Sequence, residues 1–103
     1  MTDFDTDLKT KLALETARIH WRELQPWFAK GHAISVAASL DLVEVSFQLC
    51  QDNKAMFEAW MLEGLVKPVE DAEAQDWFER DTELWAVVVK PWVLVQDKPL
   101  QSH

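Results

Sequence analysis

Residues 40–69 read LDLVEVSFQLCQDNKAMFEAWMLEGLVKPV, two apolar runs at helical spacing with a polar break at 51–53. Gly64 and Pro68 follow the second run, and both residue types commonly end helices. The residues after Gly64 have the composition of a short extended segment, 65–69. This stretch therefore predicts a helix, a tight turn, a second helix and a strand, which is the shape of a helix-turn-helix.

The start of the first of these helices carries its own signal. Asp41 precedes the apolar run and can accept hydrogen bonds from the free N–H groups of the first turn. Glu44, three positions later, can reach back to the backbone of Asp41 and complete a capping box. Asp41 is therefore the expected cap of this helix.

Three elements are predicted upstream of residue 40. Apolar residues at helical spacing predict a helix over 7–18 and a second over 20–31, which Gly31 would end in a left-handed conformation. Pro26 is tolerated only in a first turn, so this second helix starts late or is kinked. Residues 33–38 then alternate in the pattern of a short strand.

Downstream, the sequence predicts one more helix over 70–80 and a long extended segment, LWAVVVKPWVLVQ, over 84–96. Lys90 and Pro91 make a poor two-residue hairpin turn, because such turns favour Gly, Asn or Asp at positive φ. We therefore expect a bulge or bend at Pro91, with the first half of the segment central in the sheet and the second half an edge strand.

In order, these elements predict an α+β protein: a small, winged-helix-like single domain over residues 1–103. We expect about five helices and a small three-stranded, mainly antiparallel sheet, with frayed termini at 1–6 and 98–103. The helix at 70–80 would replace the usual wing loop. That departure weakens any expectation that a wing contacts DNA.

The distribution of charge argues against nucleic-acid binding. Residues 41–83 contain twelve Asp and Glu against three Lys and Arg, a net charge of −9, whereas the whole chain carries −8. DNA-binding proteins neutralise phosphates with Lys and Arg, and this interaction supplies most of their non-specific affinity. The segment that would enter a major groove is thus the most acidic part of the chain.

The composition indicates one compact domain without a membrane segment. The chain has 103 residues, of which 49% are hydrophobic, and its apolar runs are far shorter than the roughly 20 residues of a membrane span. Its N-terminus is acidic and lacks the features of a signal peptide. The only cysteine, Cys50, cannot form an internal disulfide. We expect a cytoplasmic protein.

No catalytic, metal or cofactor motif is present. His20 and His32 are not at zinc-ligand spacing, His103 belongs to the tail, and we expect no metal and no cofactor. Cys50 lies in an apolar helical row, so we expect an inert buried thiol. An enzyme would have to assemble its site from scattered residues such as His20, Glu23, Asp41 and Glu44, and we do not expect one.

Six tryptophans are unusual in so short a chain, and we expect most of them to anchor the core. Trp92 is the expected exception, because it follows the predicted bend at Pro91. An unpaired apolar edge strand invites another chain to pair with it. The sequence thus predicts an interaction surface, and a homodimer, at Trp92, Val93 and Val95.

Several of these segments resemble a known family. The chain from about Leu8 to Gln96, and most specifically WAVVVKPWVLVQ, is similar to short bacterial proteins grouped as the domain of unknown function 2288 family. The resemblance implies a small single-domain bacterial protein and carries over no activity, cofactor or functional residue. Three interpretations stay open: a protein-interaction module with a protein partner or itself, a winged-helix nucleic-acid binder, and an enzyme.

Overall fold

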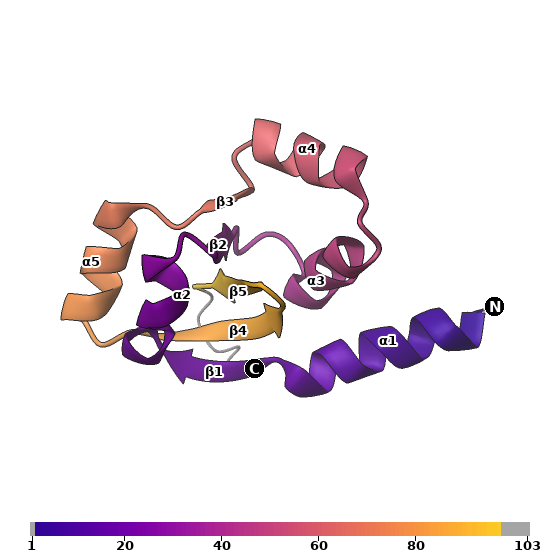
Figure 1. Ribbon diagram of the computed structural model, residues 1–103, viewed down its shortest axis with the longest axis horizontal. Helices are drawn as coiled ribbons and strands as arrows, with labels where there is room; N and C mark the ends of the chain where they lie inside the picture. Colours follow the sequence, from indigo (N-terminus) through magenta and orange to yellow (C-terminus); the bar gives the residue numbers. More distant parts are fainter. Residues whose placement is uncertain (1, 98–103) are drawn as a thin grey trace.

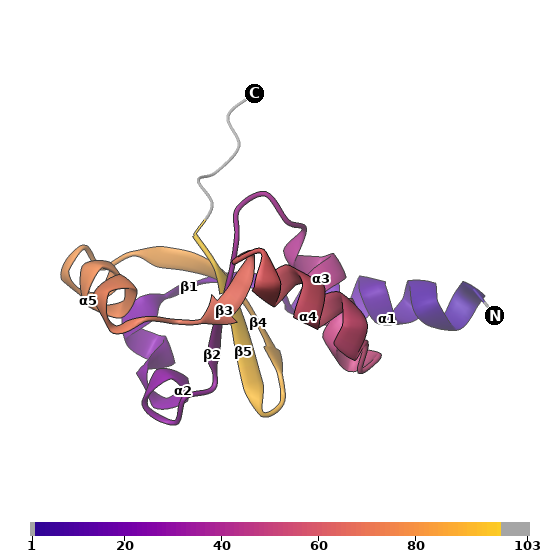
Figure 2. The ribbon, with the colours of Figure 1, turned by 90° about the horizontal axis from the view of Figure 1, so that it is seen from above.

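A five-stranded mixed sheet forms the centre of the computed structural model, with helices on both of its faces (Figures 1 and 2). The structure describes residues 2–97, and the side chains of residues 7–97. The elements in chain order are α1 Thr2–Glu15, β1 Ala17–His20, the 3₁₀ helix η1 Trp21–Leu24, α2 Gln25–Ala29, β2 Ala33–Val36, α3 Leu42–Cys50, α4 Lys54–Leu62, β3 Val66–Pro68, α5 Asp71–Glu79, β4 Glu83–Val89 and β5 Trp92–Gln96.

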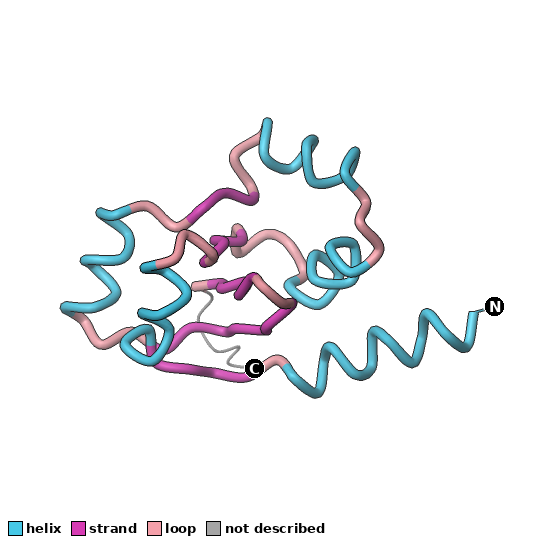
Figure 3. Tube along the Cα trace, viewed as in Figure 1, coloured by secondary structure: helices cyan, strands magenta, loops and turns pink. Residues whose placement is uncertain are grey.

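The order of the strands across the sheet is β1-β4-β5-β2-β3 (Figure 3). β5 is central: it pairs antiparallel with β4 and parallel with β2, where Ile34 lies opposite Leu94. β1 and β3 are the two edges, antiparallel to β4 and β2 respectively. Successive side chains of a strand point to opposite faces, so each strand contributes to two cores.

The two faces of the sheet carry separate hydrophobic cores. On the face covered by η1, α2 and α5, Trp21 and Trp77 pack against each other with ring centroids 5.2 Å apart. On the other face, α1 and α3 cover the sheet, and Val45 and Leu94 are both buried there. Figure 2 shows the sheet between these two groups of helices.

The expected α+β class and the five helices are confirmed, but the three-stranded, mainly antiparallel sheet is wrong. One of the additional strands is β1, which overlaps the end of the helix predicted over 7–18 and the start of the helix predicted over 20–31. That helix ends at Glu15, where the Thr16 hydroxyl donates to the carbonyl oxygen of Leu12 at 2.7 Å. The following four residues pair with β4 instead, so a contact distant in sequence overrides the local helical spacing.

The expected bulge or bend at Pro91 is also wrong, because β4 and β5 form a hairpin. Val89 pairs with Trp92 across a two-residue turn, and the Lys90–Pro91 peptide bond in this turn is cis. Two-residue hairpin turns of types I′ and II′ require positive φ, whereas turns with a cis proline form a separate class without that requirement. The chain after Pro91 therefore turns back into the centre of the sheet.

The helix pair that opened the sequence argument is confirmed in outline. The Asp41 side chain accepts from the backbone N–H of Val43 at 3.0 Å and of Glu44 at 3.5 Å. Glu44 does not reach back to complete the capping box, because its carboxylate binds Lys9 at 2.9 Å. Gly31 ends α2 at a φ of 78°, as its position predicts.

The structure describes only part of the two termini that are predicted to be frayed. The backbone of residues 2–6 is helical and belongs to α1. Residues 1 and 98–103, including His103, lie outside the described residues.

Candidate docking site

A hollow of about 330 Å³ lies between α4 and the sheet, and we call it the α4 hollow. Such a volume is at the lower end of the range for sites that hold a small ligand or an anchoring side chain. Its lining is almost entirely apolar. Its principal side chains are Ile34, Pro68 and Trp92 from the strands and Leu49, Phe57 and Met61 from α3 and α4.

The hollow stays open because α4 covers the sheet incompletely. None of the nine residues of α4, all of them described, is buried. Phe57 and Trp60 face the body of the protein, with ring centroids 5.4 Å apart, and both remain partly exposed. Met61 at the rim is 52% exposed. Apolar side chains from both helix and sheet are thus left in contact with water.

A second hollow of about 350 Å³ lies beside the β4–β5 turn, and we call it the hairpin hollow. Lys30, His32, Lys90 and Trp27 contribute to its lining. The linings of the two hollows adjoin along the chain, since Lys30 and His32 of the hairpin hollow flank Gly31 of the α4 hollow. There the ring of His32 contacts Trp92, with centroids 5.1 Å apart.

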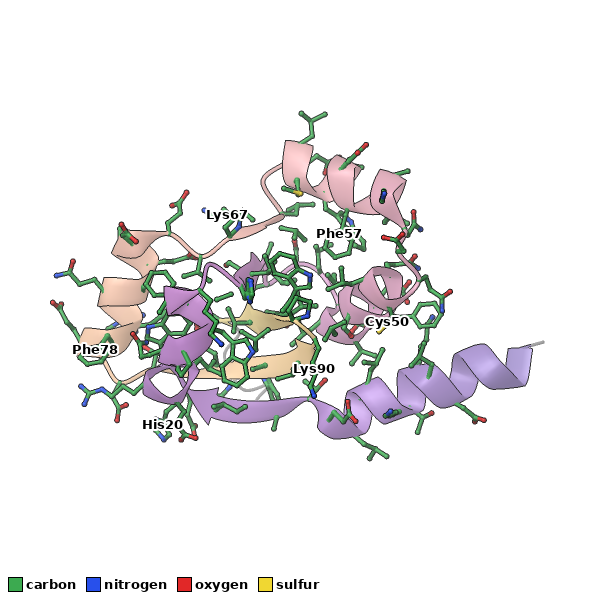
Figure 4. All side chains as sticks on the ribbon, viewed as in Figure 1. His20, Cys50, Phe57, Lys67, Phe78 and Lys90 are labelled. Carbon is green, nitrogen blue, oxygen red and sulfur yellow. The ribbon has the colours of Figure 1, made fainter. Side chains whose placement is uncertain are left out.

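The charge around these hollows is opposite to that of the chain as a whole. Among the described residues, no Asp or Glu lines either hollow, although the chain contains 18 of them. Lys67 lines the α4 hollow, and its Nζ lies 3.6 Å from a carboxylate oxygen of Glu70. Lys30 and Lys90 make no ion pair with any residue of 7–97. Figure 4 labels Lys67 beside β3, Phe57 beside α4 and Lys90 lower in the same view.

The residues predicted as an interaction surface are placed differently from the expectation. Val93 and Val95 are both fully buried at 0% exposure, in the core beneath α2 and α5. The edge strand on which the prediction rested is wrong, because β5 is paired on both sides. Trp92 is partly exposed and lines the α4 hollow, so an interaction role for this residue stays a prediction.

The four residues proposed as a scattered enzyme site are not brought together. Asp41 caps α3, and Glu44 binds Lys9 and accepts from the Gln48 amide at 2.7 Å. These two hydrogen bonds lower the pKa of Glu44. His20 lies instead at the end of β1, with Nδ1 3.4 Å from Asp81. Figure 4 shows His20 at the end of the molecule away from Cys50, the last residue of α3.

A more polar hollow of about 390 Å³ lies between β2 and α5 and contains three carboxylates. Hydrogen bonds to Arg80 lower the pKa of Asp76. Catalytic acids and bases usually show the reverse, a carboxyl group whose pKa is raised by burial. Each carboxylate already has a partner: Ser35 for Glu73, Arg80 for Asp76 and Trp77 for Asp97.

The expectation of a buried Cys50 is wrong, because this residue is exposed at the end of α3. Partial desolvation nevertheless raises the pKa of its thiol, and the negative charge of Glu15 raises it further. A raised pKa reduces the fraction of thiolate at neutral pH, which makes the thiol a poor nucleophile. Within the described residues, no three His, Cys, Asp or Glu side chains are grouped as metal ligands would be.

Comparison with known proteins adds the family. The model of a family described as "Protein of unknown function (DUF2288)" matches residues 7–97, nearly the whole chain. The protein belongs to the DUF2288 family. A solution NMR structure of PA1075 from Pseudomonas aeruginosa is similar, with 45% sequence identity and a TM-score of 0.80. The match covers 94% of this chain and 90% of PA1075. The comparison with curated proteins found no match.

In this member of the DUF2288 family, reasoning from sequence missed most of the residues around the α4 hollow, including Leu49, Phe57 and Met61. The available signal was the composition of α4, KAMFEAWML, which has only two charged residues and no polar face. A helix that is apolar all round needs a partner on each side. No helix within residues 2–97 combines the length and apolar character needed to cross a membrane.

Proposed function

We propose that this protein is a non-catalytic, acidic protein-interaction module of the bacterial cytoplasm. It docks an apolar side chain, flanked by carboxylates on a partner protein, into the α4 hollow. The single observation that carries this proposal is the contrast in charge. An apolar opening lined by Lys67 and adjoined by Lys30 and Lys90, with no Asp or Glu among the described residues that line it, occurs in a chain of net charge −8.

The energetics favour a weak, selective contact. Burying one Leu or Phe anchor contributes about 1.5–3 kcal/mol, which alone corresponds to a dissociation constant of about 6 mM or weaker, and the cost of association weakens it further. The lysines around the hollows add attraction for an acidic segment and repel a basic one. Affinity then depends on how much of α4 and the hairpin turn the partner also covers.

Nucleic acid remains the rival partner, because the sequence predicts a helix-turn-helix over the residues that form α3 and α4. In our proposal this winged-helix-like pair contacts protein rather than DNA. The second helix offers Lys54 and Glu58 as its charged residues, whereas a reading helix presents several Arg, Lys, Asn or Gln. We expect fluorescence anisotropy with mixed duplex DNA at low salt to show no binding, and tight, salt-sensitive binding would overturn this part of the proposal.

The test of the docking site uses three synthetic peptides and isotope-labelled protein. The first peptide carries a Leu anchor between Glu residues, the second the same anchor between Lys residues, and the third a Ser in place of Leu. NMR titration with the first peptide is expected to shift the Trp92 indole and the signals of Ile34 and Met61. The other two peptides are expected to leave these signals unchanged, because they lack the charge or the anchor.

Two variants show whether the shifts report the α4 hollow. Trp92→Ala removes a lining side chain and is expected to weaken the binding of the first peptide. Phe78→Ala removes an aromatic side chain that is 43% exposed on α5, away from the hollow, and is expected to leave binding unchanged. Equal binding of the Glu and Lys peptides, or shifts that survive Trp92→Ala, would refute the proposed site.

A further inference from the structure

The outer side of α4 is as apolar as the side that faces the sheet. Ala55, Ala59 and Leu62 are spaced i, i+4 and i+7, so they lie on one face of the helix, and all three are exposed. Leu62 is 90% exposed. Figure 1 places α4 at the upper margin of the molecule, with the rest of the chain below it. This outer face has no partner among the described residues.

Leu62 has the chemistry that the α4 hollow is proposed to accept. It is an apolar side chain with Glu63 next to it and Glu58 one helical turn before it, and both carboxylates are exposed. We propose that the occupant of the α4 hollow is a second copy of this chain, whose Leu62 enters the hollow. This inference rests on the proposed function, because it names the partner for the same site.

The position of Leu62 suits a symmetric pair. Met61 lines the hollow and Leu62 is the next residue, about 100° further round the helix, so the projecting side chain lies beside the opening and not inside it. A two-fold axis beside α4 therefore allows each copy to insert Leu62 into the other, which is an isologous interface.

Charge complementarity selects this partner. Lys67 lines the hollow, and in the pair it faces the acidic end of α4, at Glu63, of the other copy. Elsewhere the two copies repel each other, since each carries a net charge of −8. The attraction is thus confined to the lysine-bearing side, and the dimer is expected to be weak and fixed in orientation.

Sedimentation equilibrium of the full chain tests the pair directly. The wild-type protein is expected to associate at about 100 μM, and Leu62→Lys to weaken the association at least about tenfold. Leu14→Lys is the matched control, because Leu14 is 82% exposed on α1 and is expected to leave the association unchanged. A wild-type monomer at this concentration, or equal association of the wild type and Leu62→Lys, would overturn the inference.

A charge exchange tests the orientation. Glu63→Lys and Lys67→Glu are each expected to weaken the dimer about threefold to tenfold, and the double variant is expected to recover most of the loss, because the exchanged charges meet again across the interface. Circular dichroism confirms that each variant remains folded. Losses that simply add in the double variant would contradict this arrangement, even if the chain associates.

The two proposals fail differently. Leu62→Lys keeps the lining of the α4 hollow intact, so as a monomer it can still be titrated with the Glu-flanked Leu peptide. If the wild-type chain is monomeric and still binds that peptide, the inference that the partner is a second copy is refuted, and the proposed docking site stands. Absence of both association and peptide binding would overturn both proposals.

Discussion

β5 and α4 are both rich in apolar residues, WVLVQ and KAMFEAWML, yet they differ completely in exposure. Val93, Leu94 and Val95 of β5 have no measurable exposure, whereas no residue of α4 is buried. β5 has a strand on each edge and helices over each face. α4 touches the protein along one side only. Whether an apolar segment belongs to the core or to the surface therefore depends on how many of its sides pack against other elements, and its composition alone does not decide this.

The same change made in both segments gives the largest expected contrast. Val93→Lys places an ammonium group at a site with 0% exposure, which costs about 4 kcal/mol or more and approaches the whole stability of a small domain. We expect this variant to be unfolded or nearly so by circular dichroism and urea titration. Met56→Lys on α4, where the side chain is 39% exposed, is expected to change the free energy of unfolding by about 0.5 kcal/mol or less.

This prediction reverses what an edge strand at 92–96 would imply. On an edge, Val93→Lys would disrupt an intermolecular contact and leave the fold intact. A folded Val93→Lys protein would therefore contradict the central position of β5. An unfolded Met56→Lys protein would show that α4 is held more tightly than its exposure indicates.

A buried and a half-buried glutamine provide the next contrast. Gln96 in β5 is 3% exposed, and its Nε2 donates to the carbonyl oxygens of Ala37 at 2.8 Å and Leu40 at 2.7 Å. Gln96→Leu leaves both carbonyl groups without this donor, so we expect a loss of about 2–3 kcal/mol in urea unfolding. Gln48→Leu in α3 is the control, with a loss of about 0.5 kcal/mol, because water can replace its contacts. Equal losses would remove the distinction between the two regions.

The contrast also separates what the sequence predicts from what it does not. The α3–α4 pair, its Asp41 cap and the ends of α2 and α4 at Gly31 and Gly64 are local features, fixed by residues within a few positions of each other. These were predicted correctly. The pairing of β1 with β4, and the parallel pairing of β2 with β5, join residues far apart in the chain. Helical spacing at 7–18 carried no information about them.

The candidate site was predictable only in part. Trp92 was identified because it follows Pro91, and it does line the α4 hollow. The prediction for Val93 and Val95 depends on a bend at Lys90 and Pro91, which would place β5 at an edge of the sheet. The α4 residues were missed because apolar residues at helical spacing indicate a buried face. Spacing alone does not show whether anything covers the opposite face.

A smaller effect is expected from the ion pair that joins α1 to α3. Hydrogen bonds from Gln48 and Lys9 lower the pKa of Glu44, whose side chain is 39% exposed. A carboxyl group with a lowered folded-state pKa stabilises the protein above its unfolded pKa, and this contribution is lost as the pH falls through the folded pKa. Because solvent screens this pair, we expect Glu44→Gln to cost about 0.5 kcal/mol at pH 7.

The pH profile makes this prediction specific. The difference in urea stability between the wild type and Glu44→Gln is expected to shrink as the pH falls below the usual range of a glutamate, about 4.3. Glu58→Gln removes an equal charge from α4 and serves as the control for the effect of net charge. A difference that stays constant down to acid pH would show that the loss does not come from ionisation of Glu44.

The smallest change in stability is expected at Cys50, and this residue tests how exposed the end of α3 is. Replacing a buried Cys50 by Ala would leave a cavity and lower the free energy of unfolding by about 1–2 kcal/mol, whereas replacing an exposed one lowers it by about 0.5 kcal/mol or less.

A more sensitive measurement at Cys50 is the pH dependence of alkylation by iodoacetamide. Partial desolvation and the charge of Glu15 raise the pKa of the thiol in the folded protein, so the midpoint is expected at higher pH than in urea-unfolded protein. Glu15→Gln removes the second cause and is expected to lower the folded midpoint, while Lys11→Met removes a charge that opposes the shift and is expected to raise it. A thiol that does not react in the folded protein at any pH would show that Cys50 is buried, as the residues of β5 are. The α3–α4 side of the molecule would then be less exposed to solvent than the structure indicates.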